Sequence, residues 1–464
     1  MGVDVEGSAA IHCKDADTNI SPTQEKSTTK DDPLNADTSI TELASKDSTH
    51  SNEIAEISEK NDFSRADTSI TEPTGIDPIY THETVCDTIQ NDLHVDDSEY
   101  PYTGIPRIVI ETKNLREIKD RETEIPAKLQ IWGENAPESA VMDLTIRGRG
   151  NNTWGYPKKP YAIKFNEKTA FLGMPKAKKW VMLANYRDRT LIRNAVAFEI
   201  ARNTDQEWVP QGRFVDVFLN GQFIGNYFIC EKIEIKENRL EYDDNTFLLE
   251  FDTHYDADYK FKTNIDNYPV NIKCPKVPSD SQINYISNYV NETMRLSQNT
   301  DDSDSIWDFL DLDSYVDYFI INEIAQNAEL LWPKSFYSYK STGNKLKAGP
   351  VWDFDFATFK ISAKGLQTSN GFLFKDLKKN PTFGARLKIK WQKYRDLSFP
   401  IISYIDSLTR YLDKSNNLNH VLWPRTFNYG LIGDEDEDYE TAIEMLKKAL
   451  TERFKDLDIL FNTL

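Results

Sequence analysis

The segment Val351-Trp352-Asp353-Phe354-Asp355-Phe356 places two carboxylates inside an aromatic, apolar run. Burying an unpaired charge is expensive, so a metal ion, a basic partner or a bound proton must neutralise these acids. The alternative is a turn whose acids accept hydrogen bonds from backbone amides. The preceding residues, 345–350, are typical of a hairpin or a short strand. This segment alone does not distinguish the two interpretations, and the residues in the rest of the sequence are needed for that.

Upstream of this segment the hydrophobic pattern predicts a β-rich region with one helix. Apolar runs rich in β-branched and aromatic residues predict strands at 105–111, 127–132, 141–147, 160–165, 180–184 and 247–251. Asn220-Gly221 separates two further apolar runs, 214–219 and 225–230, which is typical of a β-hairpin. Asp188-Arg189-Thr190 precedes a helix predicted over 191–202 and is expected to cap it.

After about residue 280 the pattern changes to helical spacing. Helices are predicted at 281–297, 305–326, 381–412 in pieces, and 437–461. The chain is therefore predicted to be α+β. A tail over 1–98 precedes a β-rich lobe over 99–280, and a helical lobe over 281–464 contains the double-acid segment.

The N-terminal tail differs from the rest of the chain in composition. The net charge is −20, and residues 1–100 hold 23 acids against 6 Lys and Arg, whereas residues 101–464 hold 52 against 49. A segment dominated by Ser, Thr, Asp and Glu cannot offset its ordering entropy, so residues 1–97 are predicted to be disordered. The heptapeptide Ala-Asp-Thr-Ser-Ile-Thr-Glu occurs at 36–42 and 66–72. It is interpreted as a spacer, a modification target or a docking motif.

Several classes of protein fit this composition poorly. The near-neutral body argues against a general nucleic-acid binder. No apolar stretch is long enough to be a transmembrane segment, and Met1-Gly2-Val3-Asp4 lacks the basic-then-apolar pattern of a signal peptide. Four of the six histidines precede residue 100, which argues against a histidine-based zinc site or triad. Of the four cysteines, Cys230 and Cys274 lie in the body, without zinc-site spacing, and are predicted to be reduced.

Residue types that phosphoryl transfer from a nucleotide requires follow one another along the body of the chain. They are a glycine-containing hairpin (148–155), a strand lysine (Lys164), a helix acid (Glu199), the junctions Asn322-Glu323 and Asn327-Ala328-Glu329, and Asp353 with Asp355. Backbone amides of a glycine hairpin approach phosphates closely, and a lysine held by a helix acid offsets phosphate charge. A loop carboxylate accepts the proton of a hydroxyl, and Asn or Asp oxygens ligate Mg²⁺.

These segments resemble the CotH kinase family, which is named for a bacterial spore coat protein. The resemblance covers roughly residues 100–464. The segments that carry it are Arg147-Gly148-Arg149-Gly150-Asn151-Asn152-Thr153-Trp154-Gly155, Pro157-Lys158-Lys159-Pro160-Tyr161, Ile163-Lys164-Phe165, Leu183 to Thr190 with Arg193-Asn194, Tyr227 with Glu231-Lys232-Ile233, Asn322-Glu323 through Pro333-Lys334-Ser335, and Trp352-Asp353-Phe354-Asp355.

The resemblance implies an atypical, two-lobed protein-kinase-like fold and the use of ATP with Mg²⁺ or Mn²⁺. It further implies a protein substrate with Ser/Thr-rich segments, and a protein that is exported, on a cell surface or part of a spore coat. The Ser/Thr-rich tail is a candidate for autophosphorylation.

The family's motifs also suggest a role for each matching residue. Asp353 is expected to bind metal, Asp355 to support it or bind a second ion, and Asn327 to join them. Glu329 is expected to be the catalytic base. Lys164, with Lys159 as the alternative, is expected to contact phosphate and to pair with Glu199. Arg147, Arg149 and Asn151 are expected near the nucleotide, although the two arginines equally suit pairing with surface acids. Glu231 either lines the nucleotide base or ends a strand.

Two other functions are considered beside a kinase. Glu329 stands where the family more often has Asp, and Phe356-Ala357-Thr358-Phe359-Lys360 replaces the usual ending after the double acid. These departures suggest a pseudokinase scaffold that binds a nucleotide or a partner without turnover. A carbohydrate-processing enzyme is the third hypothesis, because residues two apart on a strand lie about 6–7 Å apart on one face, compatible with a glycosidase pair.

Overall fold

The computed structural model describes residues 92–240, 242–243, 245–299, 304–361, 364–424 and 432–463. All of these residues belong to one compact unit, Val85–Leu464. The disorder predicted for the tail up to residue 91, with both copies of its repeat, lies outside the described residues. The described chain begins slightly before the predicted boundary at 98, and Leu93 is buried against Val109, Phe218 and Phe223.

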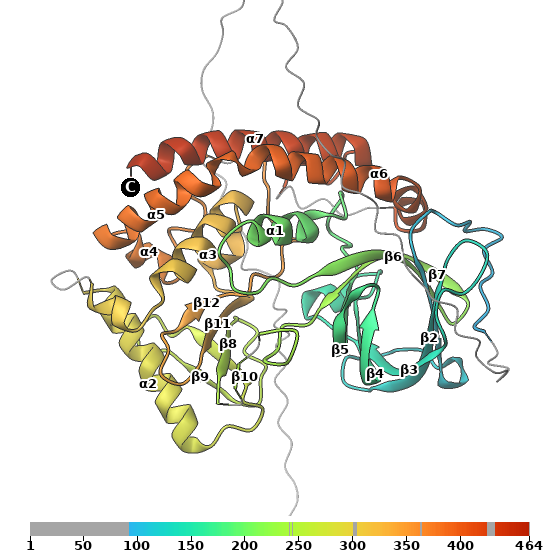
Figure 1. Ribbon diagram of the computed structural model, residues 1–464, viewed down its shortest axis with the longest axis horizontal. Coiled ribbons are helices and arrows are strands. Elements are labelled where there is room, and N and C mark those ends of the chain that lie inside the picture. Colours follow the sequence, from blue (N-terminus) through green and yellow to red (C-terminus); the bar gives the residue numbers. More distant parts are fainter. Residues whose placement is uncertain are drawn as a thin grey trace, which may run out of the picture. The chain divides into compact units, whose positions relative to one another are not determined.

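Seven strands close into a barrel in the order β1-β2-β3-β4-β5-β7-β6 (Figure 1). They are β1 (Arg107–Thr112), β2 (Ile125–Trp132), β3 (Met142–Gly148), β4 (Tyr161–Phe171), β5 (Met174–Leu183), β6 (Gly212–Leu219) and β7 (Gln222–Glu231). Neighbouring strands are antiparallel except β1 and β6, whose parallel pairing closes the barrel. The β6–β7 hairpin turns at Asn220 and Gly221, which both have positive φ, as its Asn-Gly signal predicts.

A second, five-stranded sheet has the order β12-β11-β8-β10-β9. Its strands are β8 (Phe247–Phe251), β9 (Lys260–Lys262), β10 (Pro269–Cys274), β11 (Phe336–Lys340) and β12 (Lys347–Ala348). Because β8 pairs with β11, this sheet joins segments from both sides of the boundary predicted at residue 280. The predicted α+β class is confirmed, with the β-rich part organised as a barrel and a separate sheet.

Seven α-helices occur in the described residues, mostly in the C-terminal half. They are α1 (Arg193–Arg202), α2 (Asp280–Ser297), α3 (Leu312–Ala325), α4 (Phe374–Leu377), α5 (Pro381–Tyr394), α6 (Ser398–Leu422) and α7 (Tyr439–Thr463). Short 3-10 turns occur at η1 (Lys113–Leu115), η2 (Asn152–Gly155), η3 (Ser305–Asp308), η4 (Ala328–Leu331) and η5 (Arg395–Leu397). Helix α6 reaches the barrel, where Ser415 donates a hydrogen bond to Asp216 of β6.

A buried ion pair connects α3, α7 and the chain that follows the double-acid segment. Arg453 of α7 and Glu323 of α3 are both almost fully buried, and their charged groups lie 2.6 Å apart. The Glu323 carboxylate also accepts hydrogen bonds from the backbone amides of Gln367, Thr368 and Ser369. One carboxylate thus holds residues 367–369 against the end of α3, just before the loop that carries Glu329.

Replacement of Arg453 by Met should therefore destabilise the protein strongly. The substitution leaves Glu323 buried without its cation, which typically costs about 3–5 kcal/mol. Denaturant unfolding of the wild type, Arg453→Met and the double variant Arg453→Met/Glu323→Gln measures the effect. The double variant should recover part of the loss because the buried charge is gone. A loss well under 1 kcal/mol for Arg453→Met would contradict this role.

Candidate active site

The double-acid segment is a turn anchored through the peptide of Phe354, which is fully buried. The Phe354 amide donates to the side chain of Asn194 in α1 at 2.8 Å, and its carbonyl accepts from Thr358 at 2.6 Å. Asp353 has a φ of +67°, a left-handed conformation that is uncommon for a residue other than glycine. The backbone is therefore fixed on both sides of Phe354, and this fixes where the flanking carboxylates lie.

Negative charge gathers around Asp355. The carboxylates of Asp353, Asp188 and Glu329 act on it, and Asp353 lies within hydrogen-bonding reach. Burial, with this repulsion, raises the pKa of Asp355 well above its usual value. In the described part of the chain no lysine or arginine forms an ion pair with Asp353 or Asp355, whereas Asp188 pairs with Arg193. The turn thus contains two adjacent acids that the protein itself does not neutralise.

Glu329 faces the same cluster from η4. Its side chain is 12 % exposed and lies 3.6 Å from the ammonium of Lys334. Burial and the charge of Asp353 raise the pKa of Glu329 to about 8, although Lys334 opposes the shift. Asn327 caps this turn, because its side-chain oxygen accepts from the Glu329 amide at 3.1 Å. Its predicted role as a metal ligand stays a prediction.

Two residues at the start of α1, Arg193 and Asn194, have structural roles close to the acid turn. Asp188 accepts a hydrogen bond from the Arg193 amide at 2.8 Å, although the N-cap residue of α1 is Ile192, which makes no side-chain cap. The Arg193 side chain bridges Asp188 and Asp434, which ties the start of α1 to the chain before α7. Asn194 holds the Phe354 peptide as described above. Both residues therefore have structural roles beside the carboxylates.

Asp252, at the end of β8, is a further carboxylate of this site that the sequence did not single out. It accepts a hydrogen bond from the Ser335 amide at 3.1 Å, and the Ser335 hydroxyl lies 3.3 Å from Asp353. His254 contacts the other Asp252 oxygen at 2.7 Å. The run Glu250-Phe251-Asp252, with acids closing a buried strand, is the signal that would have found it.

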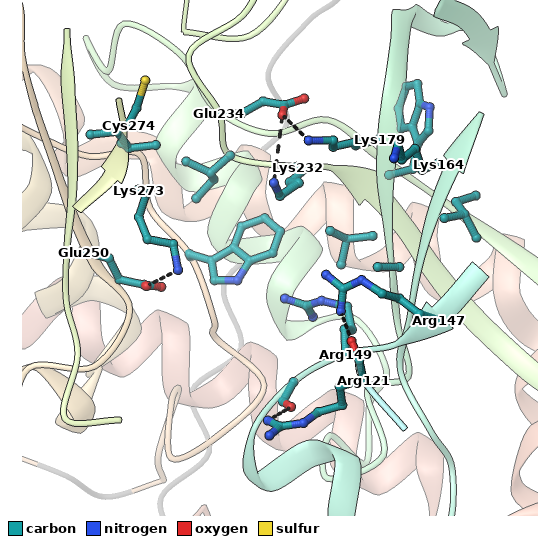
Figure 2. Close-up of a pocket in the computed structure, with 18 of the residues that line it drawn as sticks. Arg121, Arg147, Arg149, Lys164, Lys179, Lys232, Glu234, Glu250, Lys273 and Cys274 are labelled. Carbon is teal, nitrogen blue, oxygen red and sulfur yellow. Dashed lines mark hydrogen bonds and ion pairs between the residues drawn. The ribbon is translucent and has the colours of Figure 1, made fainter. Parts of the chain in front are cut away.

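A cleft of about 770 Å³ lies beside the acid turn, between strands of the barrel and strands of the second sheet. Trp352 and Asp252 belong both to the surroundings of the turn and to the cleft wall. Lysines and arginines outnumber carboxylates among the lining residues. Figure 2 shows the arginines gathered on one side of the cleft, apart from Lys232 with Glu234 and from Lys273 with Glu250. A cationic cleft therefore borders an anionic turn.

Four of the predicted nucleotide contacts line this cleft: Arg147, Arg149, Asn151 and Lys164. Three of them already have partners. Arg147 donates to the carbonyl of Gly148 at 3.0 Å, Asn151 accepts from Arg121 at 2.7 Å, and Lys164 pairs with Glu124 at 3.2 Å. Within the described residues Arg149 forms no ion pair, and its guanidinium lies over the Trp352 ring, 6.0 Å from the centroid. Among the predicted nucleotide-contacting cations, Arg149 is thus the one that contacts the residue next to Asp353, namely Trp352.

The predicted pair of Lys164 with Glu199 is wrong. Glu199 pairs with Arg202, one turn further along α1, at 2.9 Å. It lines a different cavity, together with Arg202, Trp208, Arg213 and Tyr404. Lys164 pairs with Glu124 instead, and Lys164 and Glu199 line different cavities.

Lys159 and Glu231 do not line the cleft either. Lys159 donates to the Trp154 carbonyl at 2.7 Å. Glu231 is fully buried against Arg239 at 2.5 Å and accepts from the Gln211 amide at 2.9 Å. The alternative interpretation of Glu231, as the end of a strand, fits these contacts. Lys158, next to Lys159, is buried and donates to Asn419 of α6, and burial lowers its pKa to about 7.

The geometry also contradicts the glycosidase hypothesis. Residues 351–356 form no strand, and the carboxyls of Asp353 and Asp355 lie within hydrogen-bonding reach of each other. Paired glycosidase carboxyls are separated by at least about 5 Å to accommodate a sugar or a water molecule. The premise of two acids on one face of a strand is therefore wrong.

The raised pKa of Glu329 predicts a pH-dependent stability difference. Between pH 4.5 and 8 the folded protein keeps a proton on Glu329 that the unfolded chain has lost, so the stability from this group falls as pH rises from about 4.5 to about 8 and levels off above that. The unfolding free energies of the wild type and of Glu329→Gln are measured from pH 5 to 9 without divalent cations. As pH rises, the wild type should lose stability relative to the variant. The slope is at most about 1.4 kcal/mol per pH unit. A difference that does not change with pH would show that Glu329 titrates normally.

The family described as "CotH kinase protein" matches residues 146–457, which is most of the chain. No curated protein matches the sequence. Over the described ranges, no three His, Cys, Asp or Glu side chains form a metal-binding group, and no helix there has the length and hydrophobicity to cross a bilayer.

Proposed function

Because the chain belongs to the CotH kinase family, we propose that it is an ATP- and Mg²⁺-dependent protein kinase. Its substrates are serines and threonines of a secreted, cell-surface or coat protein, and its own Ser/Thr-rich tail is a further target. The observation that supports this most strongly is the pair Asp353 and Asp355, which has no basic partner within the described residues and borders a cationic cleft. The barrel and the helical region with the second sheet serve as the two lobes.

The acid turn suits a divalent cation that is bound jointly by protein and nucleotide. Mg²⁺ typically takes one or two carboxylates and completes its shell with phosphate oxygens and water, so a three-ligand protein cage is unnecessary. Asp353 and Asp355 supply the carboxylates, and Mn²⁺ is an alternative ion. When bound, the ion supplies positive charge that offsets the charge developing on the transferred phosphoryl group.

Other residues of the site bind the phosphates, accept the proton and position the acid turn. Arg149, with Arg147 and Lys164 farther along the cleft, offsets the charge of the triphosphate. The hydroxyl oxygen of the acceptor attacks the γ-phosphorus, the bond to the β–γ bridging oxygen breaks, and ADP leaves. Glu329 accepts the proton released by the hydroxyl, which requires that its carboxylate be ionised. Ser335 and Asn194 hold the acid turn in place during transfer.

The second candidate function is a pseudokinase scaffold. The observation that favours it is the pKa of Glu329, which burial and Asp353 raise to about 8, so that this base is largely protonated at neutral pH. A protonated Glu329 cannot accept a proton, and a nucleotide would then be bound without turnover. The turn after Asp355 is also tied down, because the Phe359 amide donates to Ala325 at the end of α3.

Labelling with γ-labelled ATP distinguishes the two functions. Wild type with Mg²⁺ or Mn²⁺ should incorporate label into protein, and Asp353→Asn should lose at least about a hundredfold in rate, because removal of one electrostatic contact in a transition state typically costs that much. Glu199→Gln is the matched control: it removes a carboxylate outside the cleft and should retain near wild-type transfer.

Mapped phosphosites and thermal shifts then complete the test. Unimpaired labelling by Asp353→Asn would contradict the kinase. Absence of label from wild type, together with metal-dependent thermal stabilisation by ATP, would establish the scaffold.

A further inference from the structure

Four lysines form one wall of the cleft, here called the lysine wall: Lys179, Lys232, Lys273 and Lys276. They come from β5, from the segment after β7, from β10 and from the segment after β10. Lys232 and Lys273 are half-buried, and Lys276 is exposed. Segments far apart in sequence therefore bring four cations to a single surface.

The lysine wall has fewer carboxylates than cations in close contact. Glu234 lies 3.9 Å from both Lys179 and Lys232, at the limit of an ion pair, and is shared between them. Glu250 pairs with Lys273 at 2.8 Å. Lys276 forms no ion pair among the described residues, and Asp256 acts on Lys273 only at longer range. Positive charge therefore remains on this wall for an anionic ligand.

This wall adjoins the cations assigned to the nucleotide at one end, where Lys179 of β5 lies opposite Lys164 of β4 in the barrel. Arg147 and Arg149 lie on the barrel side of the cleft, apart from Lys273 and Lys232 (Figure 2). The charge of Asp252 acts on Lys273 at longer range, and Ser335 connects Asp252 to Asp353. The lysine wall thus extends from the reaction centre outward, along a path that an acceptor segment can follow.

The arginines on one side of the cleft and the lysines of the lysine wall favour different kinds of anion. Arginine offers a planar fork that matches phosphate, whereas lysine is a point charge on a flexible stem. Separate lysines at increasing exposure fit separate carboxylates along an extended peptide better than one compact phosphate group. The chain itself contains such a sequence twice, since the repeat at 36–42 and 66–72 places three hydroxyl residues between an aspartate and a glutamate.

We propose that the lysine wall binds acidic residues that flank the accepting serine or threonine, so that the substrates of this protein are acidic Ser/Thr-rich segments. This inference rests on the proposed kinase function for the transfer step, but the binding step is independent of it. Opposite charges across an interface favour selection of partners, and such contacts weaken with added salt.

Direct binding is the first test. The probe is a fluorescent peptide with the sequence of residues 36–42, and its partner peptide carries Lys in place of the aspartate and the glutamate. The protein is the full chain with its own repeats neutralised, through Asp37→Asn, Glu42→Gln, Asp67→Asn and Glu72→Gln. The acidic peptide should bind at least about fivefold more tightly than the basic one at low salt. Equal affinity for the two peptides would overturn the proposal.

Charge reversal then locates the binding site. Lys276→Glu, an exposed position without an ion pair among the described residues, should weaken acidic-peptide binding roughly fivefold. Lys448→Glu on the exposed face of α7 is the matched control and should leave the affinity unchanged. Equal weakening by both variants would mean that net charge, and not this wall, is responsible. Tighter binding of an oligonucleotide or of inorganic polyphosphate than of the acidic peptide, at equal charge, would also overturn the proposal.

Transfer kinetics separate this inference from the proposed function. In Lys276→Glu the KM for the acidic peptide should rise while the KM for ATP stays within twofold of wild type. A rise in the KM for ATP alone would assign the wall to the nucleotide and overturn the inference. If no peptide is phosphorylated but the acidic peptide still binds in a Lys276-dependent manner, the kinase proposal fails and the binding proposal stands.

Discussion

The repulsion among partly buried carboxylates at the turn 353–355 is the constraint on which the site depends. Asp353, Asp188 and Glu329 all act on Asp355; Asp188 pairs with Arg193 and Glu329 lies 3.6 Å from Lys334, whereas Asp353 and Asp355 form no ion pair among the described residues. Buried like charges stay ionised together only if a cation compensates them; otherwise protons do. The fold therefore holds a place where a divalent cation or protons are required, and it rigidly fixes the backbone there through Phe354.

The two β structures give this turn its surroundings. The barrel supplies cations from β3 and β4 and from the loop between them, and the second sheet supplies Asp252 and Lys273. Helix α1 contributes Asn194 to the turn, and the buried pair of Glu323 with Arg453 fixes the segment that follows it. Side chains of both signs, from segments far apart in sequence, thereby meet at one cleft.

Most elements of the fold follow from local sequence pattern. The hairpin at Asn220-Gly221, the other barrel strands and the long helices have strong periodic or turn signals. Strands β9, β10 and β11 were missed: β9 is only three residues long and pairs with β10, and β11 pairs with the distant strand β8. The cleft residues Arg147, Arg149 and Lys164 and the acid turn were found. The Glu199 pairing was wrong and Asp252 was overlooked, because contacts between distant segments leave no local signal.

Diffraction from crystals grown with Mn²⁺ and a non-hydrolysable ATP analogue tests the central claim most directly, because Mn²⁺ is located by its anomalous signal. Neutralisation of the acid turn by a nucleotide-bound ion predicts an anomalous peak within coordination distance of Asp353 and Asp355, with the phosphates facing Arg149. A peak elsewhere in the cleft, or a bound nucleotide whose phosphates lie on the lysine wall with no ion at the turn, would contradict it.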